Sequence, residues 1–572
     1  MPRDPELNGR HAVVKKRAKL VPRPQEAVRE PVRPAIWQRF EAFLEQRGGW
    51  LSVALVLIAT IRIVSTYTTF SYTFDEPAHI ACGMEWLEKH TYTYEAQHPP
   101  LARVMTAILP KLAGAHGWNK GGMWDEGLAI LFNDGKPDST LALARAGVLP
   151  FFWITCWIVF SCARWISGRT AAAVLAVFLV TMTPTVLAHA GLATTDMGLT
   201  AMFLLAIYTG WRWLEEPVWW RAASFGASLG LAVLAKFSTL AFLPSVAVVA
   251  LAIWWISERP SLKKTLELLR ARGLQALCAG LIAVVVIWAG YRFSFGRTAA
   301  FSFSVPAPEL FKGIEEVRKH NENGHLTYLL GVPNTVGWPY FYVIALGVKT
   351  PLPILALGLV GLGLLFSRKL AGTRGWIMPS TVLGILIFAS FFTQIKIGTR
   401  HVLPVVIAFS IAGGCAAVWL LQRFSKSKVA QYAVVLLLLL APIPSLAAHP
   451  DYLAYFNFLA GDKPEAVLVD SDLDWSQDVK RLAKRLKDVG AKEVYFNQYA
   501  PGDLPKFFGF PPIQPLDVNG PRPGWNAVSV TPMMYGLWGD ERYVYDRGFE
   551  FWPELVPTER VGRGILLFYS AP

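Results

Sequence analysis

The sequence has 572 residues, of which 53% are hydrophobic, 13% aromatic and 17% charged, and its formal net charge is +14. Apolar runs such as LSVALVLIATI (51–61) recur along it, and each extends to about 20 residues, enough to cross a hydrocarbon core of roughly 30 Å. This pattern argues against a soluble protein and for a multi-span membrane protein. The Lys and Arg residues stand in short segments between apolar runs, where they set topology, so nucleic acid is not the expected partner.

The N-terminal residues 1–48 are basic, rich in proline and without apolar periodicity, which predicts a disordered cytoplasmic tail. This polar stretch is too long for a cleavable secretory signal, so the first apolar run is expected to remain as a membrane anchor. Four of the five cysteines fall inside apolar runs and leave Cys82 alone in a polar segment, so no disulfide framework is expected.

The apolar stretches predict about eleven transmembrane helices in a domain that covers residues 49–448. Loops on one side, such as RWISGR (164–169) and SRKLAGTR (367–374), carry basic residues, so the positive-inside rule places them and the N-terminal tail in the cytoplasm. The opposite, outer face receives a first long loop (69–141), a second long loop (292–350) and everything after about residue 448. The predicted spans are 50–68, 142–162, 170–188, 197–212, 222–236, 239–256, 273–291, 351–366, 376–393, 402–421 and 429–447.

The C-terminal residues 449–572 gain acidic residues, prolines and polar loops, which indicates a separate extracytoplasmic domain. Residues 466–470 (AVLVD) are typical of a buried strand, residues 476–489 have apolar positions at helical spacing, and residues 492–497 (KEVYFN) are typical of a second strand. These elements predict a βαβ unit in a small α/β domain. The predicted fold class is therefore an α-helical polytopic membrane protein with a C-terminal extracytoplasmic α/β domain.

Two adjacent carboxylates, Asp75 and Glu76, stand in TFDEPAH (73–79), where the chain leaves the first span. A structural interpretation is the start of a helix, since Asp is a good N-cap, Pro77 suits the first turn and both carboxylates favour the helix dipole. A functional interpretation is a general base at the membrane surface that takes a proton from an attacking hydroxyl. One residue could do both.

Further along the first long loop, EAQHPPLAR (95–103) contains His98 and Arg103. A His before two prolines can be a simple rigid turn. His98 could also contact a metal or a phosphate, and Arg103 could bind a phosphate with two donors. Asp196 in HAGLATTDMGLT lies at the outer entry of a span, where a charge is either a helix cap or functional.

Several cations lie on the outer face, against the positive-inside bias. Lys236 separates two apolar segments, and snorkelling explains where it points but not why a Lys is there. A cation at that height would meet a lipid phosphate. Together with Lys349, Lys396, Arg400 and His401 it outlines a candidate anion site.

The run VDSDLDWSQD (469–478) alternates Asp residues in the manner of a calcium loop. The match fails because Trp475 stands where the EF-hand needs Gly, and Arg481 where it needs Glu. The plainer interpretation is a strand end followed by a helix that Asp474 caps.

In combination, these motifs resemble the GT-C superfamily of integral membrane glycosyltransferases. The similar members are the protein O-mannosyltransferases and the lipid A aminoarabinose transferases, in the form of a bacterial glycosyltransferase of the family 39 type. The resemblance covers residues 50 to 500 or so and rests on the order of five features. These are the Asp-Glu pair after the first span, HPPLAR in the same loop, TTDMGLT at a later outer turn, a lysine between spans five and six, and an outer C-terminal domain.

The resemblance implies transfer of a sugar from a polyprenyl-phosphate carrier to a hydroxyl acceptor (protein, lipid or glycan) on the outer face of a bacterial plasma membrane. Asp75 matches the catalytic aspartate and Glu76 its acidic partner, and Asp196 matches a second acidic residue of such sites. Lys236 matches a carrier-phosphate contact.

His98 and Arg103 match an HPPL-type motif in which mannosyltransferases usually have Lys at the position of Arg103. In the aminoarabinose transferases a glutamate near the position of His98 takes part in metal binding. No cofactor is therefore certain from the resemblance, and a divalent metal with His98 as a ligand stays open.

The expected reaction is an inverting displacement in which Asp75 deprotonates the acceptor hydroxyl. Lys236, Arg103 and the pair of Arg400 and His401 would stabilise the departing phosphate. Two alternatives stay open: a transporter or flippase of lipid-linked sugars, and a non-catalytic envelope scaffold. A transporter predicts charges that face each other at mid-membrane, and a scaffold predicts that Asp75→Asn leaves activity and binding intact.

Overall fold

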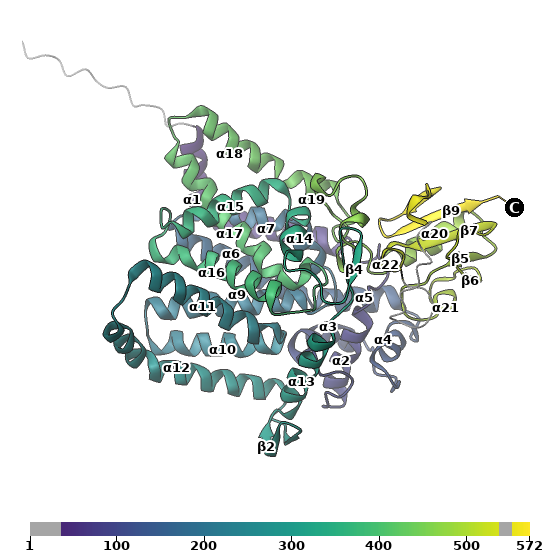
Figure 1. Ribbon diagram of the computed structural model, residues 1–572, viewed down its shortest axis with the longest axis horizontal. Helices are drawn as coiled ribbons and strands as arrows, with labels where there is room; N and C mark the ends of the chain where they lie inside the picture. Colours follow the sequence, from purple (N-terminus) through teal and green to yellow (C-terminus); the bar gives the residue numbers. More distant parts are fainter. Residues whose placement is uncertain (1–35, 537–551, 572) are drawn as a thin grey trace, which may run out of the picture.

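The computed structural model describes residues 36–536 and 552–571. Long helices lie side by side and form the larger part of the molecule, and the C-terminal sheet lies beyond one end of them (Figure 1). The helices of this bundle are α1 (Ile36–Val64), α6 (Leu149–Ser167), α7 (Thr170–Thr181), α8 (Pro184–Ala190), α9 (Asp196–Glu215), α10 (Trp219–Ala235), α11 (Ser238–Glu258), α12 (Leu262–Gly290), α15 (Leu352–Phe366), α16 (Ile377–Phe391), α17 (Leu403–Arg423), α18 (Lys428–Leu440) and α19 (Pro442–Ala447).

The chain is a multi-pass membrane protein, and each of the predicted spans falls on helix. Seven helical segments in the described residues are long and apolar enough to cross a membrane, and an eighth joins them if the bent pair of α7 and α8 is one span. The predicted count of eleven is not confirmed. Two of the remaining helices, α10 and α15, have 17 and 15 residues, fewer than the roughly 20 that a perpendicular span needs.

Helix α17 lies at the centre of the bundle, because 94% of its most apolar window is buried, against 11% for α12 and 17% for α11. Small residues let its neighbours approach closely. A Cβ at Gly414 of α17 would meet the main-chain N of Ala176 in α7 at 2.5 Å, which is the close backbone packing that glycine permits between membrane helices. The segment that enters α17 is therefore held at a fixed place in the molecule.

The prediction of a disordered tail over residues 1–48 is wrong for residues 36–48, which form the first part of α1. Residues 1–35 lie outside the described part of the chain. The helix is stabilised there because Glu45 accepts hydrogen bonds from the main-chain N–H groups of Thr170 and Ala171, the free donors at the start of α7.

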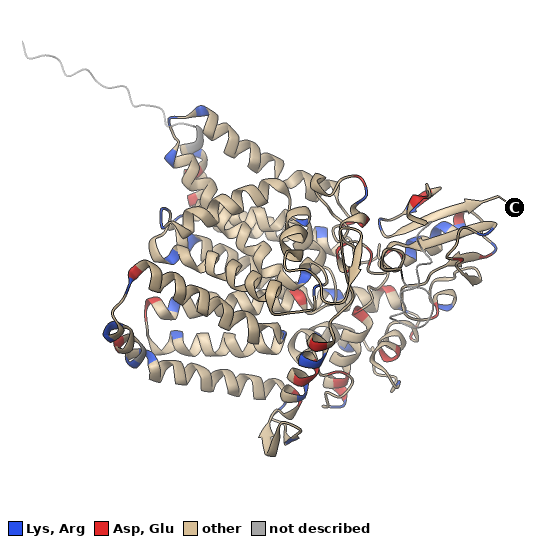
Figure 2. Ribbon diagram, in the orientation of Figure 1, with Lys and Arg blue, Asp and Glu red and all other residues tan. Residues whose placement is uncertain are grey.

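Charged residues gather at the two ends of the bundle, with long uncharged stretches of helix between them (Figure 2). The end that carries the C-terminal domain also holds the two long loops. The first contains α2 (Glu76–Glu88), α3 (Pro100–Leu112), α4 (Met123–Phe132) and the start of α5 (Pro137–Ala146). The second contains β1 (Phe295–Thr298), β2 (Phe301–Pro306), α13 (Pro308–Asn323), β3 (Thr327–Leu329), β4 (Val332–Asn334) and α14 (Phe341–Lys349).

The C-terminal domain is built on a five-stranded sheet of order β6-β5-β7-β9-β8, in which β5 runs parallel to both neighbours and the other pairs are antiparallel. Short 3-10 turns precede it: η3 (Phe458–Ala460), η4 (Pro464–Ala466) and η5 (Asp470–Asp472). The other elements are α20 (Val479–Asp488), β5 (Val494–Phe496), α21 (Leu504–Phe508), β6 (Ile513–Pro515), β7 (Gly524–Ser529), α22 (Val530–Tyr535), η7 (Trp552–Glu554), β8 (Glu559–Val561) and β9 (Ile565–Ser570).

The predicted helix at 476–489 and strand at 492–497 are confirmed by α20 and β5, but the strand at 466–470 is wrong and no βαβ unit forms there. A short apolar run does not distinguish a strand from other buried backbone. Here the run packs into the membrane domain, since Leu468 belongs to the same apolar core as α17 and Val467 packs against that core. The amino-acid composition therefore changes at residue 449, but the chain after it still packs against the membrane domain.

Candidate active site

Asp75 lies at the N-cap position of α2, yet its side chain makes no capping hydrogen bond. The capping interpretation is wrong for this side chain. Its carboxylate instead accepts a hydrogen bond from Arg400 Nη1 at 2.9 Å and is 29% exposed. Arg400 belongs to η2 (Thr399–Val402), the turn that leads into α17. The structure thus brings together two candidates that are 325 residues apart in the chain.

Glu76 points away from Asp75 into the protein and is fully buried. Both of its oxygens accept hydrogen bonds from Arg145, from Nε and Nη2 at 2.8 Å each. The main-chain N–H groups of Ala193 and Thr73 donate to it as well, again at 2.8 Å. A carboxylate that is saturated in this way fixes three chain segments around Asp75 and has no free position for a substrate.

Asp196 and Lys236 meet where α9 begins and α10 ends. Lys236 Nζ lies 2.6 Å from Asp196 Oδ1, and Arg400 Nη1 lies 3.8 Å from Asp196 Oδ2. Arg400 therefore stands between two carboxylates, Asp75 and Asp196. We call Asp75, Asp196, Lys236 and Arg400 the Arg400 cluster.

Some polar atoms of the Arg400 cluster make no hydrogen bond within the described residues. Within the part of the chain that the structure describes, Arg400 Nε and Asp196 Oδ2 are buried without a hydrogen-bond partner. An orphaned buried polar group costs about 1–3 kcal/mol, and native structures have few of them. A buried donor and a buried acceptor left without partners in one cluster are suited to a polar ligand.

Arg103 lies in a different setting, with a side chain that is 1% exposed. It forms an ion pair with Glu95, and its Nη1 donates to the hydroxyl of Tyr92 at 3.2 Å and its Nε to His79 Nδ1 at 3.1 Å. His98 Nδ1 lies 3.2 Å from Arg103 Nη2 and 3.3 Å from the Glu95 carboxylate. We call these five residues the Arg103 cluster. Its donors are all used inside the protein, so the predicted phosphate contact of Arg103 is corrected to a structural role.

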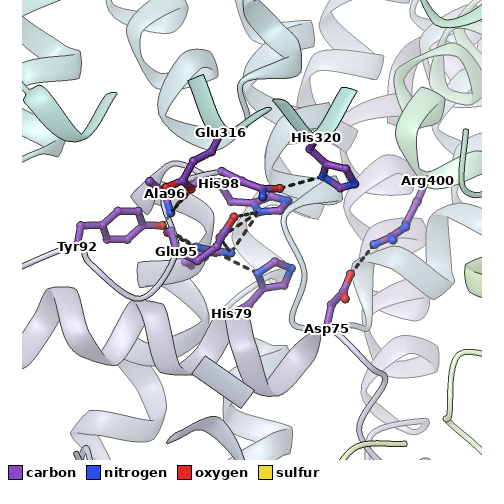
Figure 3. Close-up of polar contacts among 11 residues, drawn as sticks. Asp75, His79, Tyr92, Glu95, Ala96, His98, Glu316, His320 and Arg400 are labelled. Atoms are coloured by element: carbon purple, nitrogen blue, oxygen red, sulfur yellow. Dashed lines mark hydrogen bonds and ion pairs between the residues drawn. The ribbon is translucent and has the colours of Figure 1, made fainter. Parts of the chain in front are cut away.

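Figure 3 shows Glu95, His98 and His79 turned toward one another, while Asp75 points to Arg400 apart from them. Burial raises the pKa of Glu95, but Arg103 and His98 more than offset it and hold that pKa below its ordinary value. Burial, reinforced by Arg103, keeps the pKa of His79 well below its usual range. At neutral pH the Arg103 cluster therefore holds one ion pair and a neutral His79.

The predicted phosphate contact of Lys349 is also corrected. Its side chain is 2% exposed, and Nζ donates to the main-chain carbonyls of Leu453 at 2.7 Å and Asp472 at 2.6 Å. Burial lowers the pKa of Lys349 to about 8. Lys349 thus anchors the C-terminal segment, and Lys396 attaches its loop to the second long loop by donating to Val336 O at 3.2 Å. His401 follows Arg400 in η2 and is half-buried.

Sequence patterns missed other polar residues around Asp75 and Arg400. In α13, His320 bonds through Nδ1 to Gln97 Oε1 at 3.0 Å and through Nε2 to His325 Nδ1 at 3.1 Å. From the C-terminal domain, Asp470 accepts a hydrogen bond from Tyr535 at 3.3 Å. No local spacing connects these residues, and only the packing of the second long loop and the C-terminal domain against the bundle does.

A divalent metal at His98 does not fit these residues. Among the described residues, no three His, Cys, Asp or Glu side chains converge on one point in the manner of a metal site. The guanidinium of Arg103 lies 3.2 Å from the ring nitrogen of His98, and its positive charge opposes a cation there. The interpretation of VDSDLDWSQD is also corrected: Asp478, not Asp474, takes the N-cap position of α20.

Comparison with known proteins agrees with the sequence motifs. Residues 52–301 match the family model of dolichyl-phosphate-mannose-protein mannosyltransferases. The predicted resemblance to GT-C glycosyltransferases is confirmed. The match includes Asp75, Glu76, His98, Arg103, Asp196 and Lys236 of the predicted site residues and ends before Lys349, Arg400 and His401.

A solved protein O-mannosyltransferase structure has a similar fold. The *Saccharomyces cerevisiae* protein O-mannosyltransferase Pmt1–Pmt2 complex bound to the sugar donor matches with a TM-score of 0.51 at 12% identity, over 71% of this chain and 90% of that chain. ArnT from *Cupriavidus metallidurans* bound to undecaprenyl phosphate matches with a TM-score of 0.48 at 12% identity, over 91% and 98% of the two chains. At such identities a likeness shows the fold alone. A search of curated protein sequences finds no match.

Proposed function

We propose that this chain is a membrane glycosyltransferase that moves a sugar from a polyprenyl-phosphate carrier to a hydroxyl acceptor on the outer face of the membrane. The observation that carries the proposal is the Arg400 cluster: a partly exposed carboxylate, Asp75, beside two cations that retain free donors. The mannosyltransferase family match over residues 52–301 supports the class of reaction and of donor.

The proposed reaction is a single displacement at C1 of the sugar. Asp75 takes the proton of the acceptor hydroxyl, and the oxygen attacks C1 from the side opposite the phosphate. The bond between C1 and the phosphate oxygen breaks with its electron pair, so the carrier phosphate departs and the anomeric centre is inverted. The proton on Asp75 then passes to solvent, to which this side chain is exposed.

Arg400 and Lys236 would hold the donor phosphate. Arg400 Nε is a buried donor without a partner, and the Lys236 ammonium, with three protons, makes one ion pair, to Asp196. Fixed donors in a site with little water stabilise developing negative charge strongly. A phosphate that draws Arg400 Nη1 toward itself would also release the Asp75 carboxylate for proton transfer. The same cation thereby couples donor binding to the availability of the base.

The location of these charges favours a transferase over a transporter. The cluster lies at the ends of helices, at the start of α9 and the C-terminal end of α10, where the two long loops and the C-terminal domain pack. A carrier with its isoprenoid chain in the lipid and its sugar in the polar layer would reach this height. A transport path would instead need charges along the middle of the bundle.

The test is to reconstitute the purified protein with a panel of radiolabelled polyprenyl-phosphate sugars and cell-envelope acceptors. We expect transfer from one carrier, and a rate about 10²–10⁴-fold lower in Asp75→Asn. Asp451→Asn is the matched control, because Asp451 also pairs with an arginine, Arg481 at 2.6 Å, and is 22% exposed. If no sugar moves from any carrier, the function is wrong. If Asp75→Asn works as fast as the parent, Asp75 is not the base.

A further inference from the structure

The segment Asp470–Asp478 (DSDLDWSQD) comes from the C-terminal domain, yet every residue in it is buried. We propose that Asp472 and Trp475 of this segment are positioning residues that set Arg400 and Asp75 at their working separation. This inference rests on the proposed function, in which Arg400 holds the phosphate and Asp75 takes the proton. The segment Asp470–Asp478 lies outside residues 52–301, which carry the family match.

Asp472 fixes the turn that presents Arg400. Its carboxylate accepts hydrogen bonds from the hydroxyl of Thr399 at 2.6 Å and from the Thr399 main-chain N–H at 3.1 Å. The turn is a close fit: Gly398 has φ +74°, and a Cβ there would lie 2.4 Å from Ser471 Oγ. Only glycine tolerates both the conformation and the contact. Since Arg400 follows Thr399 directly, Asp472 fixes the main-chain position from which the Arg400 side chain extends.

Trp475 fixes the direction of the same guanidinium. The Arg400 Cζ atom lies over the Trp475 ring, 4.2 Å from its centroid. A cation–π contact is more stabilising when it is buried, as here, than when it is exposed to water. The Trp475 ring therefore limits where the Arg400 guanidinium can lie while its Nη1 donates to Asp75 at 2.9 Å.

The same segment also holds the chain that leads to Asp75. The main-chain carbonyl of Trp475 accepts the N–H of Phe74 at 3.1 Å, and that of Gln477 accepts the N–H of Ser71 at 3.1 Å. The hydroxyl of Ser71 donates to the carbonyl of Ser476 at 2.8 Å. The main chain beside Asp75 and the main chain beside Arg400 are therefore both attached to this one short segment, which fixes the positions from which the two side chains extend.

The segment is itself rigid, which a positioning element must be. Gln477 closes it with two hydrogen bonds, accepting from Trp475 N and donating to Leu473 O at 2.7 Å each. Lys349 donates to Asp472 O at 2.6 Å from the bundle side. A fully buried polar segment is costly unless its groups are paired, and here several of the pairings are made with the two parts of the chain that carry the site.

Asp478 supplies a matched control within the same segment. It is as buried as Asp472, at 0% against 1%, and it also accepts main-chain hydrogen bonds, from Arg563 and Gly564 at 2.9 Å each. Those main-chain partners lie in the turn between β8 and β9, and the ion-pair partner of Asp478, Arg481 at 3.0 Å, is likewise outside the Arg400 cluster. Asp478→Asn should therefore lose at least as much stability as Asp472→Asn, and the two should differ in catalysis.

The experiment compares the full-length parent, Asp472→Asn and Asp478→Asn after reconstitution. In Asp472→Asn we expect kcat to fall about 100-fold, because an error of about 1 Å in placement has an effect of that size, with the donor KM within threefold. Asp478→Asn should keep the parental kcat at an equal or larger loss of thermal stability. Trp475→Phe, which reduces the cation–π surface, should lower kcat a fewfold, and Trp552→Phe, equally buried in the C-terminal domain, should not.

Hydrogen exchange of residues 396–402 gives a readout that does not depend on turnover. Loss of protection in Asp472→Asn and not in Asp478→Asn is expected, and equal protection in both variants overturns the inference. So does a parental kcat in Asp472→Asn, or a fall in kcat in both variants that follows their stability. A parent that transfers no sugar refutes the proposed function alone, and hydrogen exchange then decides the positioning role.

Discussion

The Arg103 cluster and the Arg400 cluster each contain a buried arginine paired with a carboxylate, and they differ in how many hydrogen-bonding groups they leave without a partner. Arg103 is paired with Glu95, Tyr92 and His79, so its N–H donors all bond to groups of the protein. Arg400 pairs with Asp75 but keeps a buried Nε without a partner among the described residues. A buried arginine is therefore informative about function through its free hydrogen-bonding capacity rather than through its charge.

The difference also appears in how each cluster is connected to the chain. Arg103, Glu95 and His98 come from one loop, and their contacts close locally. The Arg400 cluster draws Asp75 from before α2, Lys236 from the end of α10 and Arg400 from before α17. Local contacts hold a loop in shape, whereas contacts among distant segments are costly in chain entropy and concentrate where a site has to be assembled.

The largest expected difference comes from making the same substitution in both clusters. Arg400→Lys keeps the charge but loses the planar fork that serves Asp75 and the free Nε, so kcat should fall about 10²-fold or more with little change in thermal stability. Arg103→Lys should do the reverse, lowering the unfolding temperature while the folded protein keeps its kcat. Sugar transfer and thermal unfolding of both variants check this, and equal losses of kcat would remove the distinction between the clusters.

A second substitution acts on the Arg103 cluster alone. Glu95→Gln leaves the Arg103 guanidinium buried beside a neutral amide, and removal of one partner from a buried pair costs about 3–5 kcal/mol. Because Glu95 is 12% exposed, the lower end of that range is expected. Denaturant or thermal unfolding measures the loss, with Glu315→Gln as the control, since Glu315 pairs with Arg318 on the surface of α13 at 42% exposure. A stability equal to that of the control would mean that Arg103 needs no counter-charge.

Part of this comparison is accessible from the sequence. Asp75, Asp196 and Lys236 stand out because charges at the ends of apolar runs need a reason, and the structure places all three in one cluster with Arg400. The partner of Arg103 also left a signal, because Glu95 opens the same EAQHPPLAR motif and offers an opposite charge within one loop. Weighing that pair would have predicted a structural arginine.

Other features depend on tertiary contacts that no local pattern encodes. The apolar run at 466–470 has strand composition but packs beside the bundle, with Leu468 in the bundle core. The acidic run that follows looks like a metal loop or a cap, and its carboxylates instead bind main-chain groups of distant segments, Thr399 for Asp472 and Thr531 for Asp474. Spacing reports which residues share a face of one element, and it carries no information about which other element covers that face.

The smallest expected effect is the pH dependence of the stability that the Arg103 cluster contributes. His79 is surrounded by Arg103, His98, Glu95 and Asp196, and burial, with Arg103, holds its folded-state pKa well below the ordinary value of 6.5. A depressed folded pKa means that the unfolded chain binds the extra proton first, so this contribution to stability is complete above about pH 6.5 and is lost as the pH falls below it. At pH 5.5 the loss is about 1 kcal/mol.

Thermal unfolding of the parent and of His79→Gln at pH 7.5 and pH 5.5 measures this contribution by difference. Gln keeps an acceptor for Arg103 Nε, which donates to His79 Nδ1 at 3.1 Å, and it does not titrate. We expect the parent to lose about 2 °C more than the variant on acidification. Titration elsewhere acts on both proteins alike and cancels. An equal loss in the two proteins would mean that His79 takes up its proton inside the fold, which a cluster with no spare hydrogen-bonding capacity does not allow.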